Sequence, residues 1–166
     1  MRILAIDPGE ARTGLALADD TTRIATPLDL IEIPANQQGG AALIDALARA
    51  ARDHAPGAAD AILMGDPINM DGSAGPRATR TRALARMLAD ALARPITLVD
   101  ERRSSVHADE RMARSGLTRK QKKSRRDAIA AAAIADAFLD DPASVTGVVD
   151  PDRPAGPGEQ SQQPGR

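Results

Sequence analysis

Apolar residues in the first part of the chain occur in short runs separated by turn-forming residues. The runs at residues 2–7 and 14–19 flank a Pro-Gly turn, which is typical of two strands of a hairpin. A third strand is predicted over residues 23–33, where Pro27 favours an edge position or a bulge. The short links between these strands predict a three-stranded antiparallel meander.

Helical spacing of apolar residues begins after the meander and alternates with two more short apolar runs. The predicted elements are a helix over residues 41–54, a strand over 61–64, a helix over 76–93, a strand over 96–99, a short helix over 105–114 and an Ala-rich helix over 127–140. Strands that alternate with helices favour parallel pairing. The sequence therefore predicts an α/β fold, in which a mixed five-stranded sheet joins the meander to parallel strands and carries helices packed on it.

The pattern indicates one domain followed by a tail. Residues 1–142 contain all the predicted elements and are long enough for one domain with a substantial core. Residues 143–166 lose the apolar periodicity and are rich in Pro, Gly, Gln and Ser. We expect this segment to be a disordered C-terminal tail.

Composition narrows the kinds of site that the chain can form. It has one Phe, two His, and no Trp, Tyr or Cys. The scarcity of aromatics argues against base-stacking platforms, and the absence of Cys excludes disulfides, thiolate zinc sites and cysteine nucleophiles. A metal site would need oxygen ligands, which favours Mg²⁺ or Mn²⁺. No signal peptide and no apolar run of membrane-spanning length is visible, so we expect a cytoplasmic protein with no membrane partner.

Charge is distributed unevenly along the chain. Residues 1–76 carry 5 Lys and Arg against 11 Asp and Glu, and residues 127–166 carry 2 against 7. Residues 77–126 carry 15 against 5, so a segment of net charge +10 lies within a chain of net charge −1. This concentration favours a surface that binds a polyanion over an ordinary solvated helix face.

Three carboxylates are expected to meet at one end of the sheet. Asp7 ends the first strand, Glu101 follows the fifth, and Asp127 begins the last helix on the face that packs against the sheet. Each has a simpler explanation alone: a turn carboxylate for Asp7, a surface ion pair for Glu101 and a helix cap for Asp127. Together they repel one another unless a cation neutralises them. With the basic segment to hold phosphates, they indicate a metal-dependent nuclease.

Four motifs stand in order along roughly residues 1–140. They are Arg2-Ile-Leu-Ala-Ile-Asp7-Pro8-Gly9 with Arg12-Thr-Gly14, then Gly65-Asp66-Pro67-Ile68-Asn69-Met70-Asp71-Gly72-Ser73 with Gly75-Pro76, then Val99-Asp100-Glu101-Arg102 with Ser104-Ser105 and Ala108, and finally Asp127 with Ala130-Ala131. On these motifs the sequence closely resembles the YqgF family of bacterial proteins. That family is described as Holliday-junction-resolvase-like and as pre-16S rRNA nucleases, with an RNase H-like fold.

The resemblance implies that Asp7, Glu101 and Asp127 are the catalytic acids and hold Mg²⁺ or Mn²⁺. It implies cleavage of phosphodiester bonds, with processing of the 5′ end of precursor 16S rRNA in ribosome biogenesis as the expected role. Two alternatives stay open: a DNA resolvase that cleaves Holliday junctions in recombination and repair, and a non-catalytic nucleic-acid-binding factor in transcription. The expected partner is structured RNA or branched DNA, bound by a monomer or a homodimer.

Basic side chains expected near the acids are candidates for nucleic-acid binding. They are Arg12, Arg77, Arg80, Arg86, Arg102, Lys120, Lys122, Lys123, Arg125 and Arg126. Two residues depart from the family pattern. The family usually has Leu at the position of Asp66, and it often has Leu at the position of Arg103. We expect Asp66 to face solvent rather than to be an added metal ligand.

Overall fold

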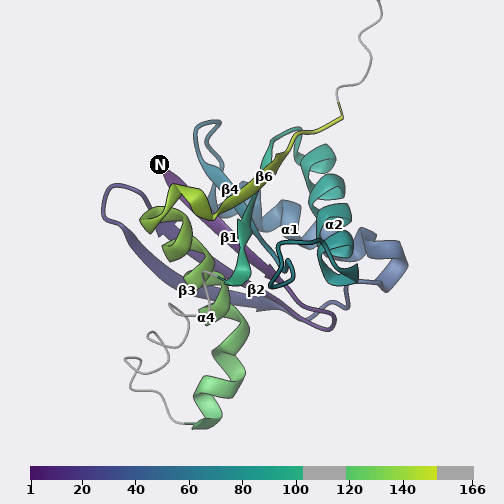
Figure 1. The fold of residues 1–166 in the computed structure, drawn as a ribbon, viewed down its shortest axis with the longest axis horizontal. Helices are drawn as coiled ribbons and strands as arrows, with labels where there is room; N and C mark the ends of the chain where they lie inside the picture. The colour runs from purple at the N-terminus through teal and green to yellow at the C-terminus, as the bar shows by residue number, and fades with distance from the viewer. Residues whose placement is uncertain (103–118, 153–166) are drawn as a thin grey trace, which may run out of the picture.

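The computed structural model of the chain describes residues 1–102 and 119–152, with side chains of the last helix described from residue 125 onward. The elements in chain order are β1 (Arg2–Pro8), β2 (Thr13–Asp19), β3 (Ile24–Ile31), the 3-10 helix η1 (Gln37–Gly40), α1 (Ala41–His54), β4 (Ala61–Asp66), α2 (Pro76–Leu92), β5 (Ile96–Asp100), α4 (Arg119–Asp140), the 3-10 helix η2 (Pro142–Ser144) and β6 (Val145–Val149) (Figure 1). The short helix predicted over residues 105–114 and the departure at Arg103 lie outside the described residues.

One mixed sheet carries the strands in the order β3-β2-β1-β4-β5-β6. The first three strands pair antiparallel, whereas β1, β4 and β5 run parallel to one another. The predicted combination of a meander with parallel strands is therefore confirmed, and it is the RNase H-like arrangement that the resemblance implies. The carboxyl ends of the three parallel strands meet at one edge of the sheet.

A sixth strand corrects the prediction of five. β6 pairs antiparallel with β5, with Ile96 opposite Val149. Residues 143–149, which the sequence analysis placed in a disordered tail, therefore form η2 and an edge strand of the sheet. Their three valines are β-branched residues that strands favour, and the surrounding Pro and Gly residues concealed this short signal. Residues 153–166 lie outside the described part of the chain.

Side chains alternate between the two faces of the sheet and build a core on each. From β1, Leu4 and Ile6 pack with residues of α1 and α2, whereas Ile3 and Ala5 pack with residues of α4. Figure 1 shows α4 crossing the sheet on the near side. Among the described residues, no helix is both long enough and apolar enough to cross a membrane.

Alanines let α4 lie close to the sheet. Ala131, Ala132, Ala135 and Ala137 are buried in the same cluster as the strand residues beneath them. From residue 125 onward, Ile134 is the one large aliphatic side chain that α4 fully buries in this cluster. Methyl groups keep the helix backbone near the strands, so this interface is thin as well as apolar.

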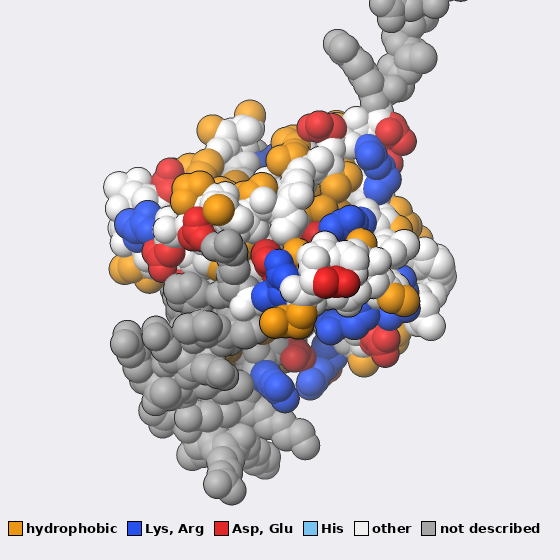
Figure 2. Space-filling model, in the orientation of Figure 1, with side chains coloured by type: hydrophobic (Ala, Val, Ile, Leu, Met, Phe, Trp, Pro, Cys, Tyr) orange, Lys and Arg blue, Asp and Glu red, His pale blue; other side chains and the backbone are white. Residues whose placement is uncertain are grey.

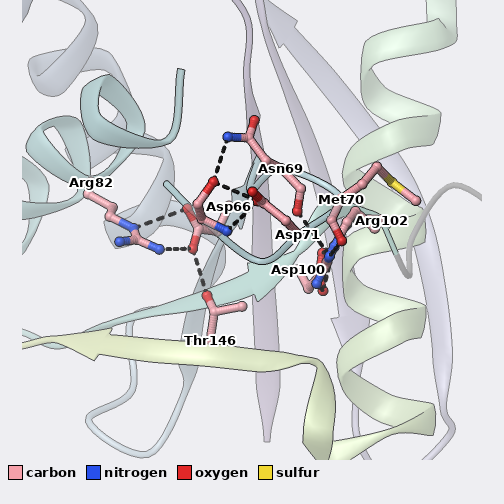
Figure 3. A network of polar contacts seen from close by, with 9 residues as sticks. Asp66, Asn69, Met70, Asp71, Arg82, Asp100, Arg102 and Thr146 are labelled. Atoms are coloured by element: carbon pink, nitrogen blue, oxygen red, sulfur yellow. Dashed lines mark hydrogen bonds and ion pairs between the residues drawn. The ribbon is translucent and has the colours of Figure 1, made fainter. Parts of the chain in front are cut away.

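Asp66 is buried at the end of β4, which corrects the expectation that it faces solvent (Figure 3). Its side chain accepts a hydrogen bond of 2.8 Å from Arg82 Nη2 and another of 2.8 Å from the Thr146 hydroxyl. Strand alternation explains this placement, because the preceding Gly65 faces α4 and Asp66 therefore faces α2, which carries Arg82. The contacts join β4, α2 and β6 and fasten the C-terminal strand to the core.

Arg82→Leu should lower the free energy of unfolding by about 3 kcal/mol, because it leaves the buried Asp66 carboxylate without its cation. This is the low end of the range for buried pairs, since the Arg82 side chain is 41% exposed. The double variant Asp66→Leu/Arg82→Leu should recover most of the loss, because it removes both charges. Urea denaturation of the three proteins measures the difference, and equal losses in the two variants would contradict it.

Candidate active site

Strand alternation brings Asp7 and Glu101 to the α4 side of the sheet. Asp7 continues the series of Ala5, and Glu101 directly follows β5 in the series of Val99, and both of these apolar residues pack with α4. β4 lies between the two strands and places Gly65 between the acids. Both acids therefore project from one face at the carboxyl ends of parallel strands.

Gly65 leaves the space that the Glu101 side chain occupies. A Cβ atom at residue 65 would lie 3.0 Å from Glu101 Oε1 and 2.7 Å from Ile134 Cδ1. A larger residue would therefore displace Glu101 or α4. Glu101 is half-buried in this position, and burial raises its pKa above the usual range, while the positive charge of Arg77 opposes the rise.

Asp127 is brought to the same place by a close contact between α4 and β2. Gly14 pairs with Asp7 in the β1–β2 ladder, and a Cβ atom at Gly14 would overlap the backbone carbonyl of Asp127. The backbone of α4 therefore rests directly on the strand beside Asp7. This contact was not predicted from the sequence. Its signal is a glycine inside a strand, which often marks the close approach of another backbone.

The interpretation of Asp127 as a helix cap is wrong. α4 begins at Arg119, about two turns earlier than predicted, so Asp127 lies within the helix. The basic run before Asp127 continues the helix because Lys, Arg and Gln are good helix formers. Asp127 Oδ2 lies 3.0 Å from Arg12 Nη2, which comes from the β1–β2 turn.

The negative charges of Glu101 and Asp127 both act on Asp7. Burial raises the pKa of Asp7 to about 7, with further rises from the negative charges of Glu101 and Asp127 and an opposing effect of Arg77. Because the charges of Glu101 and Asp127 both change the pKa of Asp7, both carboxylates lie near Asp7. The structure therefore brings together the three acids that the sequence analysis singled out.

The three carboxylates are ligands that suit a hard divalent cation, but their side chains are not arranged around a common point. Carboxylates in a partly buried cluster are the ligands that Mg²⁺ and Mn²⁺ prefer, and a cation would relieve the repulsion that raises the pKa of Asp7. Among residues 1–102 and 119–152, no three Asp, Glu or His side chains lie close enough together to hold a metal ion as they stand. One carboxylate, Asp127, is paired with Arg12 instead.

Arg77 is a second basic residue near the acids, on the side of Asp7 and Glu101. It is exposed in the first turn of α2, and its charge lowers the pKa of both Asp7 and Glu101. Arg80 follows one turn later and lies 3.3 Å from Glu10 on the surface. Figure 2 shows Lys and Arg side chains gathered over the N-terminal part of α2 and beside the β1–β2 turn.

Two residues predicted to contact nucleic acid, Arg86 and Arg102, form ion pairs within the protein. Arg86 donates to the backbone carbonyl of Asp150 and lies 3.2 Å from Asp152, so it holds the segment after β6. Arg102 pairs with the buried Asp100 at 2.7 Å. Sequence position alone could not separate these arginines from Arg77, because all of them lie in the same basic segment.

The remaining basic candidates lie on α4. Arg125 and Arg126 are exposed just before Asp127. Lys120, Lys122 and Lys123 fall in the first turns of the helix, and their side chains lie outside the described ones. These five residues, with Arg12, Arg77 and Arg80, stay predictions for phosphate contacts.

Arg102 also fixes the loop that follows β4 (Figure 3). Its Nη1 donates hydrogen bonds of 3.0 Å to the carbonyl oxygens of both Asn69 and Met70. This loop and Glu101 line the same cleft. The ion pair between Arg102 and Asp100 therefore supports one wall of the site.

The sheet order, with acids at the carboxyl ends of the parallel strands and on α4, defines an RNase H-like protein. The family model described as "RuvX: Holliday junction resolvase" matches residues 1–141. The chain belongs to this family, which is the YqgF family that the four motifs resemble.

Relatives match over most of their length. A protein of Anaeromyxobacter sp. (strain Fw109-5), named "Putative pre-16S rRNA nuclease", is 40% identical over 140 residues, which cover 84% of this chain and 97% of the relative. A protein of the same name from Pelotomaculum thermopropionicum is 36% identical over 140 residues, which cover 84% of this chain and 87% of the relative. A third, from Agrobacterium fabrum, is 36% identical over 148 residues, or 89% of each chain.

Solved structures are more distant. Thermus thermophilus RuvC in complex with a Holliday junction substrate gives a TM-score of 0.48 and 14% identity, covering 82% of this chain and 91% of that one. Another structure of Thermus thermophilus RuvC gives a TM-score of 0.47 and 13% identity, covering 87% of this chain and 98% of that one.

Gly14→Ala should displace α4, because the added methyl group would overlap the Asp127 carbonyl. We expect the free energy of unfolding to fall by about 1–3 kcal/mol, the usual cost of overpacking. Gly147→Ala is the matched control in β6, where an added Cβ meets nothing within 4 Å. Urea denaturation compares the two variants, and equal stability would contradict the close contact of α4 with β2.

Asp7 should make the metal-free protein less stable as the pH rises. Its pKa of about 7 in the folded chain exceeds the ordinary value of 3.8, so the folded state holds the proton more tightly. Stability is then lost between about pH 4 and pH 7, by at most about 4 kcal/mol. Asp7→Asn should remove this loss, so urea denaturation in EDTA should show its advantage over the wild type growing from pH 4.5 to pH 8. An advantage that is the same at both pH values would refute the raised pKa.

Proposed function

We propose that the chain is a metal-dependent nuclease that hydrolyses phosphodiester bonds in precursor 16S rRNA. The observation that carries this proposal is the grouping of Asp7, Glu101 and Asp127 around one end of the sheet, with Arg77 beside them. A cluster of acids next to an exposed guanidinium suits a substrate that is itself an anion, provided that a cation offsets the acids.

Asp7, Glu101 and Asp127 would hold Mg²⁺ or Mn²⁺. When bound, such an ion lowers the pKa of a water molecule and stabilises the charge that develops on a phosphate oxygen. Asp7 lies between the other two acids in its electrostatic contacts, so it is the residue whose loss should matter most. Arg12 holds the Asp127 carboxylate in the metal-free protein and would release it when the cation binds.

Other residues of the chain position the substrate. Arg77 offers a guanidinium to a phosphate next to the acids, as a charged donor with a fixed planar geometry. Arg80, and Arg125 and Arg126 on α4, are exposed and would hold phosphates further along the polymer. Because one Phe is the sole aromatic residue of the chain, recognition would rest on the backbone and shape of the nucleic acid.

RNA is the favoured polymer because the relatives that match over most of the chain carry the name of an rRNA nuclease. The second candidate is a branched DNA, which the family description as a Holliday junction resolvase supports. Both polymers present the same phosphodiester to the same acids, so a direct comparison of substrates separates them.

The test incubates the wild-type protein and Mg²⁺ with a precursor 16S rRNA end and with a four-way DNA junction. Asp7→Asn should lose more than the about 100-fold that removal of an outer-shell partner costs a metal site. Asp45→Asn, an exposed acid on α1, is the matched control and should cleave like the wild type. Preferential cleavage of the RNA supports the proposed substrate, and preferential cleavage of the junction supports the second candidate.

A second readout does not depend on activity. Mg²⁺ should raise the midpoint of thermal unfolding of the wild type and of Asp45→Asn, but not that of Asp7→Asn, because binding to the folded state stabilises it. Full cleavage by Asp7→Asn, or the same Mg²⁺ effect on all three proteins, would refute the assignment of Asp7 as a metal ligand.

A further inference from the structure

A groove lies beside the acids, and apart from Arg77 and Arg80 its lining has no part in the function proposed so far. It lies between α2, the β1–β2 turn and the end of η1, and its volume is about 850 Å³. The residues that matter here are Pro8, Gly9, Gly40, Arg77, Leu84 and Met87. We name it the α2 groove, and its volume falls within the usual range of ligand pockets.

The α2 groove adjoins the candidate active site. Pro8, on its wall, directly follows Asp7 in the chain. Arg77 lines the groove and also lines the neighbouring cleft that contains Glu101. A polymer whose scissile phosphate lies at the acids would therefore extend into the groove past Arg77.

The lining combines apolar surface with positive charge. Leu84 and Met87 form an apolar wall on α2, and the methyl group of Met87 lies 3.5 Å from where a Cβ atom of Gly40 would stand. Met87 is 37% exposed, so its thioether is packed against Gly40 and still open to the groove. A thioether makes favourable contacts with aromatic rings, which include nucleobases by the same chemistry.

The rim favours an anion on the side next to the acids. Arg77 and Arg80 both line the groove, and Arg80 lies 3.3 Å from the exposed Glu10, which moderates its charge. Of the two arginines in the groove lining, Arg77 is the one whose charge acts on Asp7 and Glu101. An apolar wall with a guanidinium at one end matches a nucleotide, whose base is flat and apolar on its faces and whose phosphate is anionic.

We infer that the α2 groove binds the unpaired nucleotide next to the scissile phosphate, with its base against Met87 and Leu84 and its phosphate at Arg77. This inference rests on the proposed function, because it assumes a polymer at the acids. It narrows the substrate to a strand that is single at this position. In a duplex the faces of the bases are covered by stacking, so a groove that contacts a base face needs an unstacked nucleotide.

The experiment measures binding separately from cleavage. Two fluorescent RNA hairpins are compared, one with a short unpaired extension at the cleavage end and one with the same extension paired to a complementary strand. Fluorescence anisotropy in EDTA at one fixed salt concentration gives the Kd of each for the wild type. We expect tighter binding of the unpaired extension, because only that RNA can place a base in the groove.

Variants on α2 locate the effect. Ala83 is exposed and lines the groove, and Ala83→Glu should raise the Kd for the unpaired extension by at least about tenfold through like-charge repulsion. Ala91→Glu makes the same change of charge at an exposed position of the same helix outside the groove lining and should leave the Kd near the wild-type value. Met87→Ala should raise the Kd by about two- to tenfold, the range expected for a lost thioether contact.

Thermal unfolding checks that each variant is folded. We expect Ala83→Glu and Ala91→Glu to unfold near the wild-type midpoint, because both positions are exposed. Equal effects of Ala83→Glu and Ala91→Glu, or equal binding of paired and unpaired extensions by the wild type, would overturn the inference.

Cleavage with Mg²⁺ is then measured on the same RNAs. If Ala83→Glu weakens binding as expected but the wild type cleaves neither RNA, the groove is supported and the proposed function fails. If the wild type cleaves and Ala83→Glu cleaves equally well, the proposed function stands and the groove inference fails.

Discussion

The contact between the backbone of α4 and β2 at Gly14 is the constraint on which the site depends. Asp7 belongs to β1 and Glu101 directly follows β5, so the pairing of the strands positions both, but Asp127 is carried by a helix. The distance of that helix from the sheet is set by the side chains between them. With glycine on the strand and alanines on the helix, the gap closes until Asp127 and Asp7 share one electrostatic environment.

Alternation along the strands separates the acids at this edge into two sets with different roles. On the side toward α2, Asp66 faces Arg82 and Asp100 faces Arg102, so each carboxylate has a guanidinium of its own chain. On the side toward α4, the carboxylates lie near one another, and burial and mutual repulsion raise the pKa of Asp7. The first set stabilises the sheet edge and its loop. The second set is the one that we propose to hold a cation, and its Asp127 is paired with Arg12 in this structure.

Much of the fold could be predicted from the sequence because its local signals agree with the final packing. The helix over residues 41–54 has the bounds that its apolar spacing predicts, and the meander follows from short links between apolar runs. The three acids could be assembled because strand ends in a parallel sheet meet at one edge. These inferences needed only the order of the elements and the rule that alternate residues of a strand face opposite sides of the sheet.

The errors arose where a tertiary contact decides between local alternatives. Asp127 fitted a helix cap, but the basic residues before it continue the helix, and a cap and an interior position share the same local residue types. Asp66 seemed solvated because its partner Arg82 lies 16 residues away on another element. Residues 143–149 seemed disordered because their strand exists through pairing with β5. The α2 groove has no sequence signal, since its walls come from three separate segments.

The run of alanines in α4 has a consequence for how this family can vary. A segment of such low complexity looks permissive, as if most small changes would be tolerated. Here each position that faces the sheet sets a distance, and an extra methylene group there would lift Asp127 away from its partners. We therefore regard these alanines as a spacer, because their small size sets the distance between α4 and the sheet. A substitution that improves the core by adding apolar volume at this interface would therefore also move Asp127 away from Asp7.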